Sequence, residues 1–327
     1  MHVSISEYTH RQGVVYMKTL GHYRVRAGDQ EVDCAISPRL RKQLIYPTAD
    51  PSSLSHIVRG VAEIGAVDPV AVGDQVSFVD TQDGGGLIVE VLPRRNRLAR
   101  LAAGRKPLEQ VIVANVDYVV PVVAAASPAP KWNLLDRYLV SAESLGLASL
   151  VCITKLDLAG SERELDAELE VYRNAGYPVA VTSSLTGKGI EALKGYLQGS
   201  ISVLVGKSGV GKTSLLNALQ PGVGLRVKQI SRATGKGRHT TSNLEMYPLD
   251  SGGFIVDTPG MREFGLWEVE DSDLALLFPE MRPLVGRCRF GLDCTHRGEP
   301  GCTIRQAVES GEINLRRYQS YIKLQED

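Results

Sequence analysis

One short segment has the residues and spacing of a phosphate-binding loop. Residues 206–213 are GKSGVGKT and match the pattern G-x-x-x-x-G-K-[ST]. The glycines would let the backbone turn tightly and aim its N–H groups at phosphates. Lys212 would neutralise the β- and γ-phosphates, and Thr213 would ligate Mg²⁺ through its hydroxyl. The loop predicts a nucleotide site but does not distinguish GTP from ATP.

A second motif, DTPG, follows the apolar run FIV further along the chain. Asp257 would hold Mg²⁺ through water, and the amide of Gly260 would contact the γ-phosphate. The intervening region has no acidic residue from 201 to 244 and contains GRHTT. We interpret it as a switch loop in which Thr240 or Thr241 reaches Mg²⁺ and the γ-phosphate.

Two motifs upstream of the phosphate loop could bind the base. The apolar run ASLVCI leads into TKLD, where Asp157 can accept two hydrogen bonds from N1 and N2 of guanine. The stem of Lys155 would cover the purine ring. The run YPVAV leads into TSS, where the amides of Ser183 and Ser184 would meet the guanine oxygen. Each motif alone fits a surface charge pair or a turn, but their shared position at strand ends favours guanine.

Four potential metal ligands are grouped near the end of the chain. They lie within fifteen residues, and glycine and proline between them allow convergence: Cys288, Cys294, His296 and Cys302. Three thiolates and one imidazole suit tetrahedral zinc, and a closed set of four ligands indicates a structural ion. The spacing differs from C-x-x-C knuckles, so scattered thiols are the alternative. We expect Cys34 and Cys152, in apparent strands, to be core residues.

Three regions must position these groups. Short alternating runs over residues 13–92 predict a five-stranded OB-like barrel, with an SH3-like barrel as the alternative. Apolar strands then alternate with helical patterns, which predicts a doubly wound α/β sheet. After Trp267 the pattern is mostly helical. We therefore predict an OB-fold-like domain over 1–95, a nucleotide-binding α/β domain over 96–266 and a metal-binding domain over 267–327.

Overall composition limits the partners and the location. Lys and Arg number 37, as do Asp and Glu, so any nucleic-acid surface must be local. The acid-free stretch 93–107 looks like an exposed basic connector and could supply such charge. The chain has no long uncharged apolar run and no signal-like N-terminus, so we expect a cytoplasmic protein with no membrane contact. Five cysteines fit a reducing compartment. We expect a monomer.

The order of the motifs is unusual, because the base-reading motifs precede the phosphate loop, the switch and DTPG. An ordinary Ras-like GTPase has the opposite order, and circular permutation of its domain accounts for the difference. With TKLD, GKSGVGKTS, GRHTT, DTPG and the terminal Cys/His motif in this order, nearly the whole chain resembles the circularly permuted GTPases of small ribosomal subunit biogenesis, RsgA or YjeQ. The resemblance implies GTP and GDP as ligands, Mg²⁺, one structural zinc, and the small ribosomal subunit with its rRNA as partner.

The motifs give one set of candidate nucleotide-binding residues: Thr154, Lys155, Leu156, Asp157, Ser183, Ser184, Gly206, Lys207, Ser208, Gly209, Val210, Gly211, Lys212, Thr213, Ser214 and Gly260.

Two positions depart from Ras-like proteins. Thr154 replaces an asparagine whose side chain ties the base-reading loop to the phosphate loop, so we expect looser nucleotide binding with guanine selectivity kept through Asp157. Met261 stands where a glutamine orients water. The resemblance implies that His239 of GRHTT takes over once a ribosomal partner orders the switch. Lys212 of the phosphate loop is the other candidate catalytic residue. An imidazole can accept a hydrogen bond from attacking water; a solvent-exposed switch histidine is the alternative.

Two other classes of function fit parts of the sequence. One is a P-loop ATPase or kinase acting on a small molecule, with the β-domain as an accessory. The other is a non-catalytic RNA-binding module that uses GTP as a structural ligand. Strong binding of GDP but not ADP would exclude the first, and absence of turnover with and without ribosomal subunits would favour the second.

Overall fold

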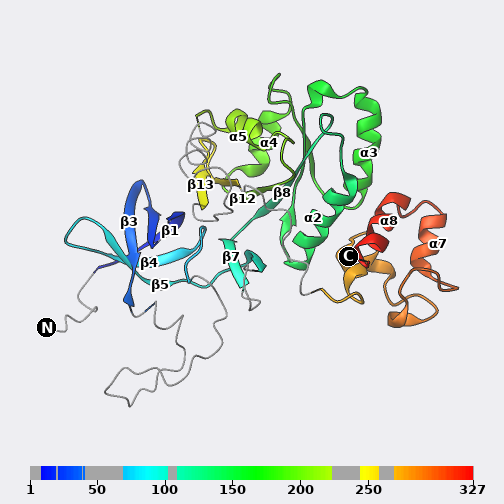
Figure 1. Ribbon diagram of the computed structural model, residues 1–327, viewed down its shortest axis with the longest axis horizontal. Helices are drawn as coiled ribbons and strands as arrows, with labels where there is room; N and C mark the ends of the chain where they lie inside the picture. The colour runs from blue at the N-terminus through cyan, green and yellow to red at the C-terminus, as the bar shows by residue number, and fades with distance from the viewer. Residues whose placement is uncertain are drawn as a thin grey trace, which may run out of the picture. The chain divides into compact units, whose positions relative to one another are not determined.

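The computed structural model describes residues 9–19, 21–38, 40, 69–101, 109–222, 244–257 and 269–326 (Figure 1). The chain forms two compact units. The first comprises residues 1–116, 228–248 and 254–257, and the second comprises 117–227, 249–253 and 258–327. The three domain boundaries expected from the sequence stay predictions.

Five strands of the first unit close into a barrel. They are β1 (His10–Thr19), β2 (His22–Ala27), β3 (Gln30–Ile36), β4 (Gln75–Asp80) and β5 (Gly86–Val91). Neighbours pair in the order β1-β2-β3-β5-β4, and β4 pairs back with β1. Alternate residues point inward, such as Tyr23 and Val25 of β2, because successive side chains of a strand face opposite sides. The closed five-stranded barrel confirms the OB-like prediction.

The described residues of the first unit form four more strands. β13 (Leu244–Pro248) pairs with β1 and with β14 (Phe254–Asp257). β6 (Arg97–Leu101) and β7 (Glu109–Ala114) form an antiparallel pair. The basic stretch therefore differs from the exposed connector that we expected. Part of it is a strand, and Arg94 donates to both carboxylate oxygens of the buried Asp74, at 2.7 and 2.8 Å.

A parallel sheet is the centre of the second unit. Its strands lie in the order β11 (Val179–Val181), β10 (Val151–Thr154), β8 (Tyr118–Ala124) and β12 (Ile201–Val205), and the short β9 (Ala148–Ser149) also pairs with β8. Residues of β10 are buried throughout, as expected of a sheet covered on both faces. The doubly wound sheet predicted from the alternating patterns is confirmed.

Helices α2 (Trp132–Ser144) and α3 (Glu162–Asn174) share one buried apolar cluster with β8 and β10. Ser161 is the N-cap of α3, and its hydroxyl accepts a hydrogen bond from the amide of Glu164 at 3.2 Å. α4 (Ile190–Leu197) and α5 (Lys212–Leu219) contact each other. The short 3-10 helix η2 (Leu156–Leu158) follows β10.

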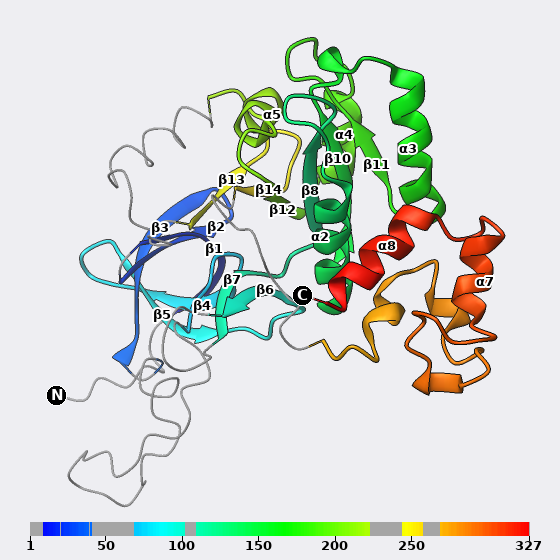
Figure 2. The ribbon, with the colours of Figure 1, turned by 45° about the vertical axis from the view of Figure 1, so that its right-hand side comes forward.

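The C-terminal region has mostly short helices. These are η4 (Leu274–Leu277), η5 (Arg282–Leu284), η6 (Gly291–Asp293), α7 (Thr303–Glu309) and α8 (Leu315–Leu324). Its own small core includes Phe278, Met281, Ile304 and Tyr321. α8 lies beside α2 (Figure 2). Among the described residues, no helix has the length and apolar character needed to cross a membrane.

Candidate nucleotide site and metal centre

The predicted phosphate loop lies between β12 and α5, as its sequence requires. Gly209 and Gly211 have φ of 85° and 99°, which glycine adopts without a steric penalty, and Gly211 is the N-cap of α5. The side chain of Val210 is buried, and those of Lys207 and Ser208 are exposed. The Lys212 ammonium folds back over the loop and donates to the carbonyls of Gly206 and Lys207, at 2.6 and 3.3 Å. The loop therefore holds its cation against its own carbonyl groups.

The base-reading loop docks onto this phosphate loop. The buried hydroxyl of Thr154, the last residue of β10, lies 2.5 Å from the carbonyl oxygen of Val210. The Lys155 ammonium donates to the carbonyl of Gly209 at 2.8 Å and also to that of Ser127. The threonine thus connects the two loops through its own hydroxyl, although it replaces the asparagine. The effect of Thr154 on nucleotide affinity stays a prediction.

TKLD and TSS meet at one edge of the sheet. The Ser183 hydroxyl donates to the Asp157 carboxylate at 2.5 Å, and the Leu156 amide donates to the carbonyl of Thr182 at 3.1 Å. Ser184 is half-buried. The side chain of Leu156 lies in the apolar core with α3, so only its backbone is available to a nucleotide. The structure therefore brings together the two motifs proposed to contact guanine.

Several predicted residues lie outside the described ranges: His239, Thr240, Thr241, Gly260 and Met261. Asp257 is the last residue of β14 in the first unit. On α5, Thr213 is half-buried and Ser214 is exposed.

A partly open apolar pocket, which sequence analysis missed, adjoins the phosphate loop. Its empty volume is about 360 Å³, part of which is open to solvent. Its lining comes from the end of β8, the beginning of α2 and the loop, and includes Val123, Leu134, Tyr138, Lys207 and Val210. No sequence motif marks it, because its residues come from two stretches that are distant in the sequence, 122–138 and 207–210.

The four predicted metal ligands converge. Their ligand atoms all lie within 4.8 Å of one another, and all four side chains are buried: Cys288, Cys294, His296 and Cys302. The Sγ atoms of Cys288 and Cys302 are 3.9 Å apart, and each is 3.5 Å from Nδ1 of His296. Zn–S bonds of about 2.3 Å in a tetrahedron place sulfur atoms about 3.8 Å apart. This cluster could hold a metal ion, and the alternative of scattered thiols is wrong.

Neighbouring side chains brace the loop that carries His296. The Glu299 carboxylate accepts bonds from the hydroxyl of Thr295 and from the amides of Thr295, Arg297 and Gly298, at 2.5 to 3.0 Å. The Thr295 hydroxyl and the backbone amides together lower the pKa of Glu299 to about 2. Burial lowers the pKa of His296, which favours the neutral imidazole that a metal requires. Tyr318 donates to the carbonyl of His296 at 2.7 Å. Sequence analysis missed these bracing groups.

Comparison with known proteins identifies the family. Residues 91–267, more than half of the chain, match the RsgA GTPase family. The small ribosomal subunit biogenesis GTPase RsgA of Gemmatimonas aurantiaca is 44% identical over 274 residues, which are 84% of this chain and 87% of that protein. The chain belongs to the RsgA GTPase family.

Solved structures of related proteins agree over nearly the full length. The crystal structure of YjeQ from Thermotoga maritima has a TM-score of 0.74 at 33% identity, covering 97% of this chain and 98% of that one. YloQ, described as a circularly permuted GTPase, has a TM-score of 0.71 at 28% identity, covering 99% and 96%. This RsgA-family chain is therefore a GTP-hydrolysing enzyme of permuted topology. Membership of the RsgA GTPase family excludes the two alternative functions, a P-loop ATPase or kinase acting on a small molecule and a non-catalytic RNA-binding module.

Proposed function

We propose that this GTPase binds the small ribosomal subunit, assists its late maturation, and hydrolyses GTP to GDP and phosphate faster when bound there. The contact of the base-reading loop with the phosphate loop, through Thr154 and Lys155, carries the nucleotide part of the proposal. The subunit is the one named for RsgA relatives such as that of Gemmatimonas aurantiaca. A GTPase whose affinity for the subunit depends on its nucleotide can bind it and leave it in turn.

Each of the described loops would contact a different part of GTP. The backbone amides of residues 206–213 and the N-terminus of α5 would hold the phosphates, with Lys212 spreading their charge. Lys212 would exchange its two carbonyl partners for phosphate oxygens. Asp157 would accept from guanine while Ser183 continues to donate to it, and the Ser184 amide would meet the guanine oxygen. Mg²⁺ would be held by Thr213, Thr240 or Thr241, and Asp257, with Gly260 at the γ-phosphate.

Hydrolysis would depend on His239, because Met261 offers no group that can orient water. A neutral imidazole near the γ-phosphate would accept a hydrogen bond from the attacking water. This part of the proposal rests on the motif GRHTT and on the resemblance that it carries.

The metal centre would hold one structural zinc, since its four ligands leave no open position for a water. It would fix a loop that carries three exposed arginines, Arg287, Arg289 and Arg297, for contact with rRNA. The barrel would provide a second rRNA contact. We place the protein in the cytoplasm as a monomer.

A pair of measurements tests the proposal. GDP should displace a fluorescent guanine nucleotide from the purified protein, and ADP at the same concentration should not. His239→Ala should bind GTP and small subunits normally but lose most of the subunit-stimulated rate, about a hundredfold or more, the range of a general base. An unchanged stimulated rate would show that His239 has no catalytic role.

A further inference from the structure

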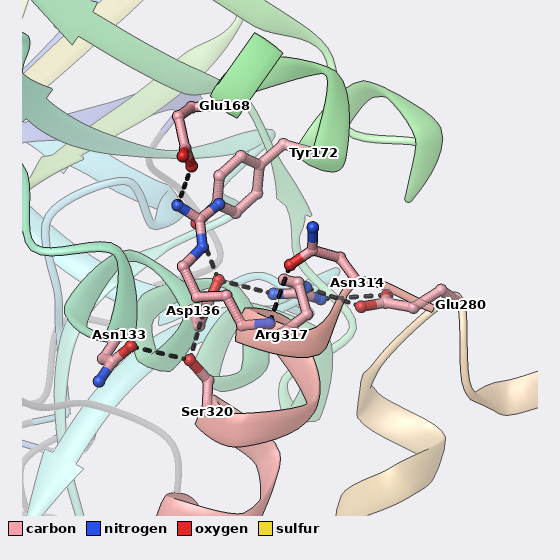
Figure 3. A network of polar contacts seen from close by, with 9 residues as sticks. Asn133, Asp136, Glu168, Tyr172, Glu280, Asn314, Arg317 and Ser320 are labelled. Atoms are coloured by element: carbon pink, nitrogen blue, oxygen red, sulfur yellow. Dashed lines mark hydrogen bonds and ion pairs between the residues drawn. The ribbon is translucent and has the colours of Figure 1, made fainter. Parts of the chain in front are cut away.

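A buried network of charged side chains joins α8 to α2 (Figure 3). The side chain of Arg317 is 1% exposed and that of Asp136 is 0% exposed, and they are 2.9 Å apart. Arg317 also donates from Nε and Nη2 to the two carboxylate oxygens of Glu280, at 2.7 and 3.1 Å. Its guanidinium lies 4.7 Å from the ring centroid of Phe278. One arginine thus links a carboxylate of α2 to a carboxylate of the C-terminal region.

Asp136 is the point at which three helices meet. Its Oδ1 accepts from Arg317 and, at 3.0 Å, from the hydroxyl of Tyr172 on α3. Its Oδ2 accepts from Ser320 on α8 at 2.5 Å. Because these bonds are buried, displacing α8 alone would leave a buried charge without its donors. α2 and α8 should therefore move together.

The beginning of α2 lies next to the nucleotide site. Leu135, adjacent to Asp136, and Tyr138, one turn further along, line the apolar pocket together with Lys207 and Val210 of the phosphate loop. The backbone carbonyl of Val210 also accepts a hydrogen bond from the hydroxyl of Thr154. A shift of α2 would change the surroundings of the phosphate loop directly.

The other end of the linkage is the metal centre. Tyr318 and Tyr321 of α8 donate to the carbonyls of His296 and Thr295, at 2.7 and 3.1 Å. The loop that holds the metal ligands is therefore attached to the same helix that carries Arg317. A force on the exposed surface of this loop would reach α2 through α8.

We propose that α8 and α2 form a relay which changes nucleotide affinity when a macromolecular partner binds at the metal-centre loop, with Arg317 and Asp136 as its positioning residues. The relay rests on the proposed function, since the small subunit is the partner that would act on it. Reciprocity requires that the nucleotide, in turn, changes the affinity of the metal-centre loop for that partner.

The test measures the dissociation rate of a fluorescent GDP from the full-length, metal-loaded protein, with and without small subunits. The main variant combines Arg317→Met, Asp136→Asn and Glu280→Gln, which removes the charges together and avoids an unpaired buried ion. The control is Arg282→Met, because Arg282 joins the same C-terminal region to Glu143 in the last turn of α2, at 2.8 Å and with an exposed side chain. Metal content and thermal unfolding show that each variant is folded.

We expect subunits to change the GDP dissociation rate of the wild type and of the control equally. In the triple variant the change should shrink by at least about fivefold, within the usual range of coupling between sites. If the triple variant does not fold, Ser320→Ala removes one bond to Asp136 and should give a smaller reduction, about twofold. If the folded triple variant responds to subunits as the wild type does, the relay is wrong and the proposed function is unaffected. If only Ser320→Ala folds, a wild-type response of that variant leads to the same conclusion. A wild-type protein that binds GDP but does not respond to subunits would contradict the relay and the proposed function together.

Discussion

At the scale of single residues, Thr154 shows how one hydroxyl can connect two loops. Its side chain is 2% exposed and reaches the carbonyl of Val210 across the boundary between the base-reading and phosphate loops. The Lys155 ammonium reaches the carbonyl of Gly209 beside it. A nucleotide that occupies both loops would benefit from their fixed spacing, because the binding geometry is then formed in advance.

Thr154→Val should weaken GDP binding about tenfold. The valine keeps the volume but leaves the Val210 carbonyl without this donor, and a buried group left without a partner costs about 1–3 kcal/mol. Titration calorimetry measures the change. Thr154→Ser, the matched control, keeps the hydroxyl and should bind nearly as the wild type does. Equal affinity of the valine variant and the wild type would show that the tie does not contribute to binding.

Asp157→Asn should lose at least about a hundredfold in GDP affinity, since two hydrogen bonds to a charged group contribute about 1.5–3 kcal/mol each. The same change should improve binding of xanthosine diphosphate, because an amide N–H₂ can donate to the extra oxygen of xanthine. Competition binding with both nucleotides checks this. Glu162→Gln, which alters a nearby exposed carboxylate paired with Lys188, is the control and should change neither affinity. Unaltered preference in Asp157→Asn would mean that another group reads the base.

The sequence predicts much of the site at this scale, because phosphate and metal binding need particular residue types at short spacing. GKSGVGKT and the three cysteines with His296 are local patterns of this kind. The tie from Thr154 to Val210 and the pocket beside Lys207 were not predictable. Both depend on contacts between segments more than fifty residues apart, and a threonine hydroxyl carries no local signal of its partner.

At the scale of elements, the barrel and the parallel sheet follow from patterns that report burial. The run VCIT predicts a covered strand, and all four of its residues are buried. Strand β6 was not predicted from the sequence, because its arginines suggested an exposed connector. Arg97 and Arg100 in fact flank Leu98 and Ala99, both buried, so burial of the apolar side chains decides the structure.

The bracing of the His296 loop by Glu299 and Tyr318 depends on the folding of the C-terminal region and had no sequence signal.

Cys302→Ser should remove the bound metal and destabilise α7 and α8. Loss of one thiolate breaks a closed four-ligand site, and Cys302 also accepts the Arg305 amide as the N-cap of α7. We expect metal content to fall from one equivalent toward zero and the unfolding midpoint to fall by at least about 5 °C, at about 2–4 °C per kcal/mol for a domain of this size. Elemental analysis and thermal melts followed by circular dichroism measure both.

Cys152→Ala provides the control for that experiment. Cys152 is fully buried in β10 and is not part of the metal cluster, and burial raises its pKa to about 12. The Cys152→Ala variant should lose some stability through a small cavity but keep one equivalent of metal. Retention of metal by Cys302→Ser would contradict the proposed ligand set.

At the scale of the whole molecule, the order of the motifs carries the most information. The base-reading loops precede the phosphate loop, yet they meet in the parallel sheet of the second unit, with β10 and β12 on either side of β8. Permutation moves the chain ends without changing which strand ends lie together. The permuted order was visible in the sequence because it depends only on motif positions. The link from the metal centre through α8 to α2 became visible only with the structure.

The central claim is that this RsgA-family chain is a GTPase that acts on the small ribosomal subunit, and one turnover assay tests it most directly. The rates of GTP and ATP hydrolysis are measured for the purified protein alone, with small subunits and with large subunits. The account predicts slow GTP hydrolysis alone, strong stimulation of GTP hydrolysis by small subunits only, and no comparable turnover of ATP. Equal stimulation by both subunits, or stimulated hydrolysis of ATP, would contradict it.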